Sequence, residues 1–515
     1  MEDISPLLLA ISVVAFTSVV TIAFKVVNWL WLRPKKYEKY LKDRGYHANP
    51  YRLLRGDILE YAAMGEEYRS KPIKLSDNVS HHALPYIHRT IKKYGKRGFI
   101  WFGPTPSIQM IDLEHIREIM SKPNVFHKMH PDPLGDTILG GLLSSEDPKW
   151  SRDRRIMNPA FHLEKLKTML PAMIQCCDEM IKKWEMLVLE TGSAEIDVWP
   201  SLEDLSGNVI SRTAFGCNYE EGRRIFILQK EQIDLFHQLL KFVVIPGWRY
   251  LPLKANRRMN TVCNEIQTLL RGIISKRQKA MQLGEVQNDD LLGLLLKSNS
   301  IEIKENGIGM DIEDVMKECK LFYFAGSETT SNLIVWTLIM LSAHPEWQAR
   351  AREEVVQAFG SRIPDFDTLN HLKIVTMVLQ EVLRLYPPVS IFIRSIPKDA
   401  ELGNIVLPGG IIFAVPVILL HHDPEIWGQD SLEFRPERFS EGVSSATKGK
   451  FSYIPFGGGP RICIGQNFAM IEAKLALTMI LQRFQFQLSP SYVHAPFPIV
   501  TLQPQHGAPL ILHQL

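Results

Sequence analysis

The residues that decide the fold are Phe456-Gly457-Gly458-Gly459-Pro460-Arg461-Ile462-Cys463-Ile464-Gly465, which place one cysteine in a glycine-rich loop. A helical pattern follows from Gln466 to about Leu481. Free backbone N–H groups in such a loop stabilise an anion, so Cys463 is suited to be a thiolate. A thiolate can be a nucleophile, a zinc ligand or an axial ligand of haem iron. No motif supplies a histidine base and no other ligands stand at zinc spacing, so single axial ligation fits best.

A long helical pattern runs from about residue 311 to 343, with Asp311 as its expected N-cap. Its middle reads Ala325-Gly326-Ser327-Glu328-Thr329-Thr330. Glycine there costs about 1 kcal/mol relative to alanine, and threonine hydroxyls can bond the carbonyl four residues back. On these residues alone, the segment is either a tolerated helix defect or a place where a flat ligand approaches the backbone beside an acid and a hydroxyl.

The cysteine loop matches the F-x-x-G-x-R-x-C-x-G signature of the haem-thiolate monooxygenases, and on it the chain is identified as a member of the cytochrome P-450 superfamily. Further motifs match in the expected order. The 325–330 segment resembles the family's oxygen-binding helix, Glu381-Val382-Leu383-Arg384 its E-x-x-R, and residues 434–439 its Pro-Glu-Arg-Phe meander. The resemblance covers essentially the whole chain and implies a single large fold, mainly α with minor β.

The resemblance also assigns roles to residues. It implies that Cys463 is the axial ligand of haem iron, whose electron donation favours O–O cleavage. It implies that Glu328 and Thr329 are the acid and alcohol that relay protons to bound dioxygen. The remaining residues that it places against the cofactor are Trp150, Arg154, Arg394, Phe456, Arg461, Gly465, Ala325 and Gly326. Without the resemblance, Trp150 and Arg154 would be an ordinary amphipathic pair.

Glu381 and Arg384 are three residues apart on a helix that Pro387-Pro388 terminates. Taken alone, they would be a surface pair that contributes little to stability. The resemblance implies instead a buried Glu381-Arg384-Arg438 network that holds the core on the haem side.

The amino-terminal segment predicts a membrane anchor. Residues 4–24 carry no charge, and residues 25–44 carry seven basic against two acidic side chains. About 20 apolar residues span a bilayer, and the positive flank stays cytosolic. A cleaved signal peptide is the alternative, but Glu2 and Asp3 make its start acidic. We expect an anchor at 1–32, a basic linker at 33–50 and a cytosolic haem-binding monooxygenase domain at 51–515, on the endoplasmic reticulum membrane.

Composition supports a folded protein. The chain has 515 residues, 45% of them hydrophobic, and a net charge of +3, which is too balanced for a nucleic-acid binder. Its six cysteines form no C-x-x-C pair, which argues against a disulfide scaffold or structural zinc and favours a reducing compartment. Helical patterns occupy 146–158, 163–190, 201–216, 224–243, 257–283, 311–343, 345–359 and 371–385, and strand-like runs 98–111, 389–396, 403–415 and 495–513.

The electrons must come from another protein. No G-x-G-x-x-G follows a strand, so nicotinamide binding has no visible place here. The resemblance implies haem b, O2 as co-substrate, and NADPH used only through a partner, NADPH-cytochrome P-450 reductase. Five basic residues form either a docking face for the reductase or an ordinary solvated surface: Lys149, Arg152, Arg155, Lys448 and Lys450.

Stretches such as 158–162, 344–350 and 502–509 resemble the plant family that contains secologanin synthase and several triterpenoid oxidases. This implies a small hydrophobic substrate of the terpenoid type (triterpenoid, iridoid or diterpenoid hormone), often a carboxylic acid. By position, residues 121–145, 230–255, 389–394 and 493–500 would line its pocket. The alternatives of another class are an anchored haem protein that binds without turnover and a membrane-tethered cysteine hydrolase.

The predicted topology has a simple test at the sequon Asn78-Val79-Ser80. A cytosolic domain never meets the glycosylation machinery, so we expect Asn78 to stay unmodified in eukaryotic cells. Endoglycosidase treatment should leave the protein's mass unchanged. A loss of mass would place the domain in the lumen.

Overall fold

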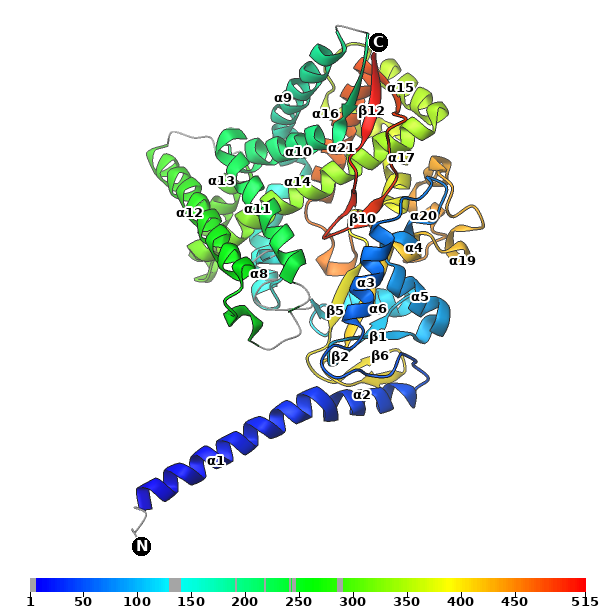
Figure 1. Ribbon diagram of the computed structural model, residues 1–515. Coiled ribbons are helices and arrows are strands. Elements are labelled where there is room, and N and C mark those ends of the chain that lie inside the picture. Colours follow the sequence, from blue (N-terminus) through cyan, green and yellow to red (C-terminus); the bar gives the residue numbers. More distant parts are fainter. Residues whose placement is uncertain are drawn as a thin grey trace.

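The computed structural model describes residues 6–128, 140–189, 192–216, 219–239, 242, 247–284 and 290–515. Helices make up most of the body, and short strands form small sheets beside them (Figure 1). The expectation of a mainly α fold with minor β is confirmed.

The principal helices agree with the predicted segments. They are α8 (Lys149–Met157), α9 (Leu163–Val188), α10 (Val198–Phe215), α11 (Tyr219–Leu239), α12 (Lys254–Leu283), α13 (Leu291–Asn306), α14 (Ile312–Ala343), α15 (Pro345–Phe359), α17 (Lys373–Leu385) and α21 (Gln466–Arg483). Of these, α13 was not predicted, because its run from Leu291 to Leu296 is buried on every side and shows no helical periodicity.

Shorter helices complete the helical part. They are α3 (Ile58–Arg69), α4 (Val79–Ala83), α5 (Pro85–Tyr94), α6 (Leu113–Ser121), α16 (Phe366–His371), α18 (Val417–His421), α19 (Pro424–Trp427) and α20 (Gly442–Ala446). Single 3₁₀ turns include η3 (Gly141–Leu143), η7 (Pro436–Phe439) and η8 (Gly459–Arg461).

The largest sheet has the order β1-β2-β8-β5-β3. Its strands are β1 (Phe99–Phe102), β2 (Thr105–Gln109), β8 (Ile412–Val415), β5 (Phe392–Ser395) and β3 (His127–Lys128). A second sheet joins β4 (Ser193–Asp197), β12 (Pro509–Gln514) and β9 (Phe484–Leu488). Two hairpins pair β6 (Ala400–Leu402) with β7 (Ile405–Leu407), and β10 (Pro496–Pro498) with β11 (Leu502–Pro504).

Helix α14 crosses the middle of the body (Figure 1). From Thr330 to Leu341 every residue is buried, as expected for a helix enclosed by others on all sides. It packs against α10, α17 and α21, so any group on its central turns is held by several elements at once.

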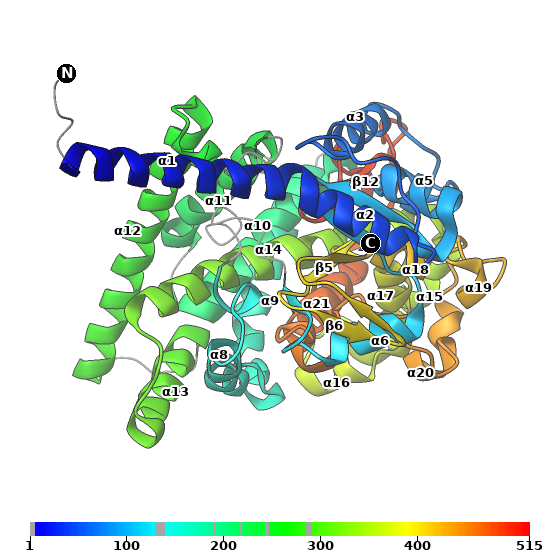
Figure 2. The same ribbon diagram turned by 90° about the horizontal axis from the view of Figure 1, so that it is seen from below.

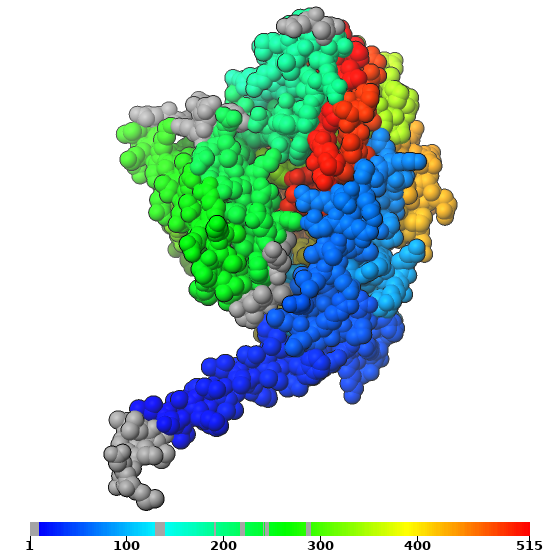
Figure 3. All heavy atoms as spheres, viewed as in Figure 1, coloured from blue at the N-terminus to red at the C-terminus, as the bar shows by residue number. Residues whose placement is uncertain are grey.

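Helix α1 (Pro6–Val27) extends away from the body (Figures 1 and 3). Among the described residues, one helical run, Ala10–Lys42, is long and apolar enough to cross a membrane, and its apolar window has no buried residue. A π-helical turn, η1 (Asn28–Leu32), joins α1 without a break to α2 (Arg33–Lys42), and Figure 2 shows the two helices end to end.

The segment predicted as a basic linker is instead part of the folded domain, at least through α2. Tyr37 and Leu41 are buried in the core beneath the largest sheet. The hydroxyl of Tyr37 donates to the carbonyl of Gly409, and that of Tyr40 to the carbonyl of Val406. The apolar face of this basic helix explains the difference, since it gives the segment a surface to dock.

Glu381 and Arg384 form a completely buried ion pair on α17, with side chains 0% exposed. Two parallel hydrogen bonds of 2.8 and 2.7 Å join Arg384 to the two oxygens of Glu381. Arg438 of η7 approaches Glu381 to 3.4 Å. The geometry therefore agrees with the buried network that the resemblance implied and not with a surface pair.

We expect Glu381→Gln to destabilise the protein by about 3–5 kcal/mol, because it leaves buried guanidinium charge without its partner. The thermal midpoint followed by circular dichroism measures this. Glu231→Gln is the control, since Glu231 pairs with Arg258 at the surface and its loss should cost about 1 kcal/mol or less. Equal effects of the two substitutions would contradict the expected role of the buried pair.

Candidate active site

The cysteine loop is shaped by its glycines. Gly459 has φ +66°, and a Cβ placed there would lie 2.2 Å from the carbonyl oxygen of Met120 at the end of α6. The backbone N–H of Cys463 donates to the carbonyl of Phe456 at 2.9 Å, which closes the loop directly before α21. Only glycine at position 459 allows this approach of loop to helix.

Cys463 is exposed, although its loop packs against α6 and α8. Burial raises the pKa of its thiol, while the N–H of Gly465 and the charges of Arg154 and Lys128 act in the opposite direction. The side chain of Cys463 is accessible, as the side chain of a residue that would bind haem iron must be.

Two helix residues predicted to touch the cofactor lie beside this loop. Arg154 donates to the carbonyl of Ile462 at 2.9 Å and to Asn158 at 2.8 Å. The guanidinium of Arg461 lies 4.7 Å from the ring centroid of Trp150. The structure thus brings α8 and the cysteine loop together.

Buried cations gather at one side of the loop. Arg461 donates to the carbonyl of Ser145 at 2.8 Å and to Glu146, and its buried Nε has no partner among the described residues. Arg394 is 8% exposed, and within the described part of the chain its side chain donates to the carbonyl of Ile393 and, at 3.6 Å, to the sulfur of Met120. Burial, followed by repulsion from Arg461, lowers the pKa of Arg394 to about 10.

Lys128 is a member of this group that the sequence analysis missed. It lies directly opposite Arg394, where β3 pairs with β5. Burial, with repulsion from Arg394 and Arg461, lowers the pKa of Lys128 to about 7. Three basic side chains thus lie near the carboxylate of Glu146, to which Arg461 donates, and the two propionates of haem would add negative charge to pair with them. Only knowledge of the strand pairing could have identified Lys128.

The central turns of α14 show the predicted hydroxyl bonds to carbonyls four residues back, within a helix that stays unbroken. The hydroxyl of Thr329 donates to the carbonyl of Ala325 at 2.7 Å, and Ser327 bonds the carbonyl of Tyr323 in the same way. Ala325 is exposed, and residues 326–329 are half-buried, in contrast to the buried turns that follow. Oε1 of Glu328 accepts a hydrogen bond of 2.7 Å from the hydroxyl of Thr501.

Gly326 was expected to lie against the cofactor, and the structure shows it against a neighbouring helix. A Cβ at this position would lie 2.7 Å from Cδ1 of Ile210 on α10. The glycine therefore permits the close packing of α10 against α14, a structural role that sequence reasoning did not anticipate. Its contact with a cofactor stays a prediction.

The comparisons with known proteins agree with this geometry. A family model described as Cytochrome P450 matches residues 75–507, a span that contains the cysteine loop, the Glu381 pair and the central turns of α14. This chain is a cytochrome P450. The resemblance inferred from the sequence is confirmed, and this P450 is a haem monooxygenase that uses dioxygen and electrons from a redox partner.

The relatives are plant proteins of the 72A type. Cytochrome P450 72A397 of Kalopanax septemlobus is 55% identical over 496 residues, 96% of this chain and 95% of that protein. Cytochrome P450 CYP72A219 of Panax ginseng is 53% identical over 505 residues, 97% and 98% of the two chains. 7-Deoxyloganic acid hydroxylase of Catharanthus roseus is 49% identical over 500 residues, 96% of each chain. Because the chain is a monooxygenase, the two alternatives, a cysteine hydrolase and a haem protein without turnover, are excluded.

The basic face predicted for a reductase is only partly available in this P450. Lys149 pairs with Asp153 and Asp314, and Arg152 pairs with the same two carboxylates. Arg155 pairs with Glu302. Lys448 and Lys450 are exposed near the cysteine loop. The α8 cations are therefore bound to this P450's own carboxylates, which sequence spacing could not reveal.

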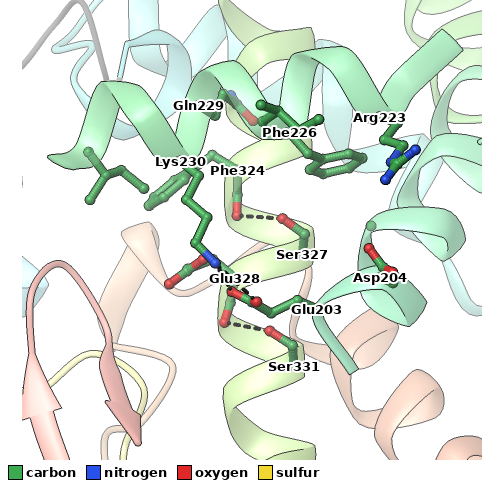
Figure 4. A pocket seen from close by; sticks show the side chains of 13 residues that line it. Glu203, Asp204, Arg223, Phe226, Gln229, Lys230, Phe324, Ser327, Glu328 and Ser331 are labelled. Carbon is green, nitrogen blue, oxygen red and sulfur yellow. Dashed lines mark hydrogen bonds and ion pairs between the residues drawn. The ribbon is translucent and has the colours of Figure 1, made fainter. Parts of the chain in front are cut away.

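A cavity of about 200 Å³, lined by both charged and apolar side chains, lies between α10, α11 and α14 (Figure 4). Its α14 wall consists of Phe324, Ser327, Glu328 and Ser331, which lie on a different face from Ala325 and Thr329. Of the stretches expected to line the substrate pocket, residues 389–394 and 493–500 are described in full. Residues 129–139, 240–241 and 243–246 lie outside the described residues, so that part stays a prediction.

We expect Gly459→Ala to displace the cysteine loop, because its new Cβ meets the Met120 backbone. The reduced, carbon-monoxide-bound spectrum should lose most of its thiolate-type Soret band. Gly449→Ala is the matched control, since Gly449 also has a positive φ, +72°, but no atom stands within 4 Å of its Cβ position. It should keep the band and cost about 1–3 kcal/mol of backbone strain. An unchanged spectrum for Gly459→Ala would contradict the packing role.

Proposed function

We propose that this P450 hydroxylates or further oxidises a hydrophobic terpenoid, with electrons from NADPH-cytochrome P-450 reductase. The observation that carries the proposal is 49% identity over nearly the whole chain to a protein named 7-deoxyloganic acid hydroxylase. That name describes hydroxylation of an iridoid acid, which belongs to the terpenoids. The chain's own resemblance to triterpenoid oxidases widens the expected class to triterpenoids and diterpenoid hormones.

In this proposal the haem is haem b, which supplies the activation of dioxygen. Cys463 binds its iron from the glycine-rich loop. Arg154, Arg394 and Arg461, with Trp150 beside them, hold its propionates, since guanidinium groups suit carboxylates. Lys128 joins them from β3. The remaining assigned contacts are those of Phe456, Gly465, Ala325 and Gly326.

Glu328 and Thr329 are the pair on α14 that handles protons in this proposal. Hydroxylation of a C–H bond with dioxygen consumes two electrons and two protons for each water released, so proton delivery must keep pace with electron delivery. A carboxylate beside a hydroxyl can accept a proton from water and pass it on. The Thr329 hydroxyl is already oriented by its bond to the Ala325 carbonyl.

The exposed apolar residues of α1 support a single-pass anchor within residues 1–32. The basic residues that follow favour a cytosolic domain on the endoplasmic reticulum membrane. Because α2 packs onto the body, we place the start of the folded domain at residue 33 and not at 51. The exposed Lys448 and Lys450 favour docking of an acidic reductase near the cysteine loop.

The test begins with the spectrum of the reduced, carbon-monoxide-bound microsomal protein. We expect a long-wavelength Soret band that disappears in Cys463→Ser, because serine cannot supply a thiolate. Cys263→Ser is the control: this partly buried cysteine lies on α12 and accepts a hydrogen bond from Gln232. The Soret band should persist in the Cys263→Ser variant.

The same preparation, supplied with reductase and NADPH, should oxidise 7-deoxyloganic acid or a pentacyclic triterpenoid acid, with a mass gain of one oxygen atom in the product. If the Soret band is present and neither compound is oxidised, the terpenoid assignment is wrong. If the wild type shows no such band, the assignment of Cys463 is wrong.

A further inference from the structure

The carboxylate of Glu328 is held from a distant part of the chain. Thr501, just before β11, donates its hydroxyl to Oε1 of Glu328 at 2.7 Å. Gln503 on β11 donates its side-chain amide to the same oxygen. Two neutral donors from one hairpin therefore set the direction of this side chain.

The donors are themselves fixed to α14. Asn332, one turn after Glu328, donates to the Thr501 hydroxyl at 3.0 Å and to the Glu328 carbonyl at 2.7 Å. Asn332 is 0% exposed and Thr501 2% exposed. The carbonyl of Leu502 accepts from the indole of Trp336 at 2.9 Å. The hairpin thus cannot shift without breaking several buried hydrogen bonds.

Glu328 also borders the cavity between α10, α11 and α14. Figure 4 shows Glu328 facing an ion pair of Glu203 and Lys230, whose closest approach is 3.0 Å. The Lys230 side chain is 68% exposed and that of Glu203 25%, so the pair lies where the cavity meets solvent. A space of this size with charged groups in its wall holds several water molecules. Glu328 therefore lies between this cavity and the hairpin that carries Thr501 and Gln503.

We propose that Thr501 and Gln503 are positioning residues for proton transfer by Glu328. They fix Oε1 beside the cavity, so that the carboxylate takes a proton from water there and passes it on in the relay that it forms with Thr329, the next residue of α14. The carboxylate is regenerated at each passage, and no electron moves. This inference rests on the proposed role of Glu328 and adds the groups that hold it in place.

The experiment uses the full-length, haem-loaded protein with excess reductase. It measures the rate of NADPH consumption under oxygen, in H2O and in D2O, without added substrate and with 7-deoxyloganic acid as a probe. Glu328→Ala should slow consumption by about tenfold and increase the solvent isotope effect, as expected when a proton-transfer group is lost. Thr501→Val and Gln503→Leu should do the same, more weakly.

Three further variants separate positioning from a merely structural role. Thr501→Ser keeps the hydroxyl and should restore the wild-type rate. Thr501→Val in the Glu328→Ala background should have no additional effect, because its action passes through Glu328. Thr337→Val is the matched control, since Thr337 is a buried threonine on α14 whose hydroxyl bonds the Leu333 carbonyl of its own helix. It should leave the rate unchanged.

Each outcome decides between the two proposals. If Glu328→Ala slows turnover but Thr501→Val and Gln503→Leu do not, the positioning inference is wrong and the role of Glu328 stands. The same holds if the effect of Thr501→Val adds fully to the effect of Glu328→Ala in the double variant. If Glu328→Ala has no effect, both are wrong. The carbon-monoxide spectrum shows whether each variant is intact. If Thr501→Val does not fold, Gln503→Leu decides alone, since Gln503 is only partly buried.

Discussion

The buried ion pair of Glu381 and Arg384 is the interaction on which the position of the cysteine loop depends. Arg384 also donates to the carbonyls of His421, Ser431 and Glu433, so one guanidinium ties α17 to the segment that leads toward the loop. These bonds offset the large cost of burying its charge. Without them residues 421–433, which precede the cysteine loop, would lose these bonds to α17.

Hydrogen bonds between neutral groups hold the residues that follow, up to the start of the cysteine loop. The Tyr453 hydroxyl donates to the Gln380 carbonyl at 2.9 Å, and the N–H of Ile454 donates to Nε2 of His421 at 3.0 Å. Burial, with repulsion from His422 and Arg384, lowers the pKa of His421 to about 3, so its ring stays neutral and can accept that bond. Phe456 begins the cysteine loop two residues later.

The sequence identified the groups that do chemistry better than the groups that place them. Cys463, Arg461 and the Glu381 pair stand in short motifs, where spacing along the chain carries the information. Lys128 and the donors Thr501 and Gln503 act only through contacts between distant segments, which no local pattern encodes. The pairing of the α8 cations with Asp314 and Glu302 escaped prediction for the same reason. Helix α13 was missed because uniform burial removes periodicity.

The continuous helix from α1 through η1 into α2 has a mechanical consequence. Because Tyr37 and Leu41 dock α2 onto the body, no slack separates a bilayer-spanning segment from the enzyme. The tilt of α1 in a membrane would set which side of the domain rests on the lipid. A redox partner anchored in the same membrane would then diffuse only within the plane of the bilayer. It would approach its docking face in nearly one orientation.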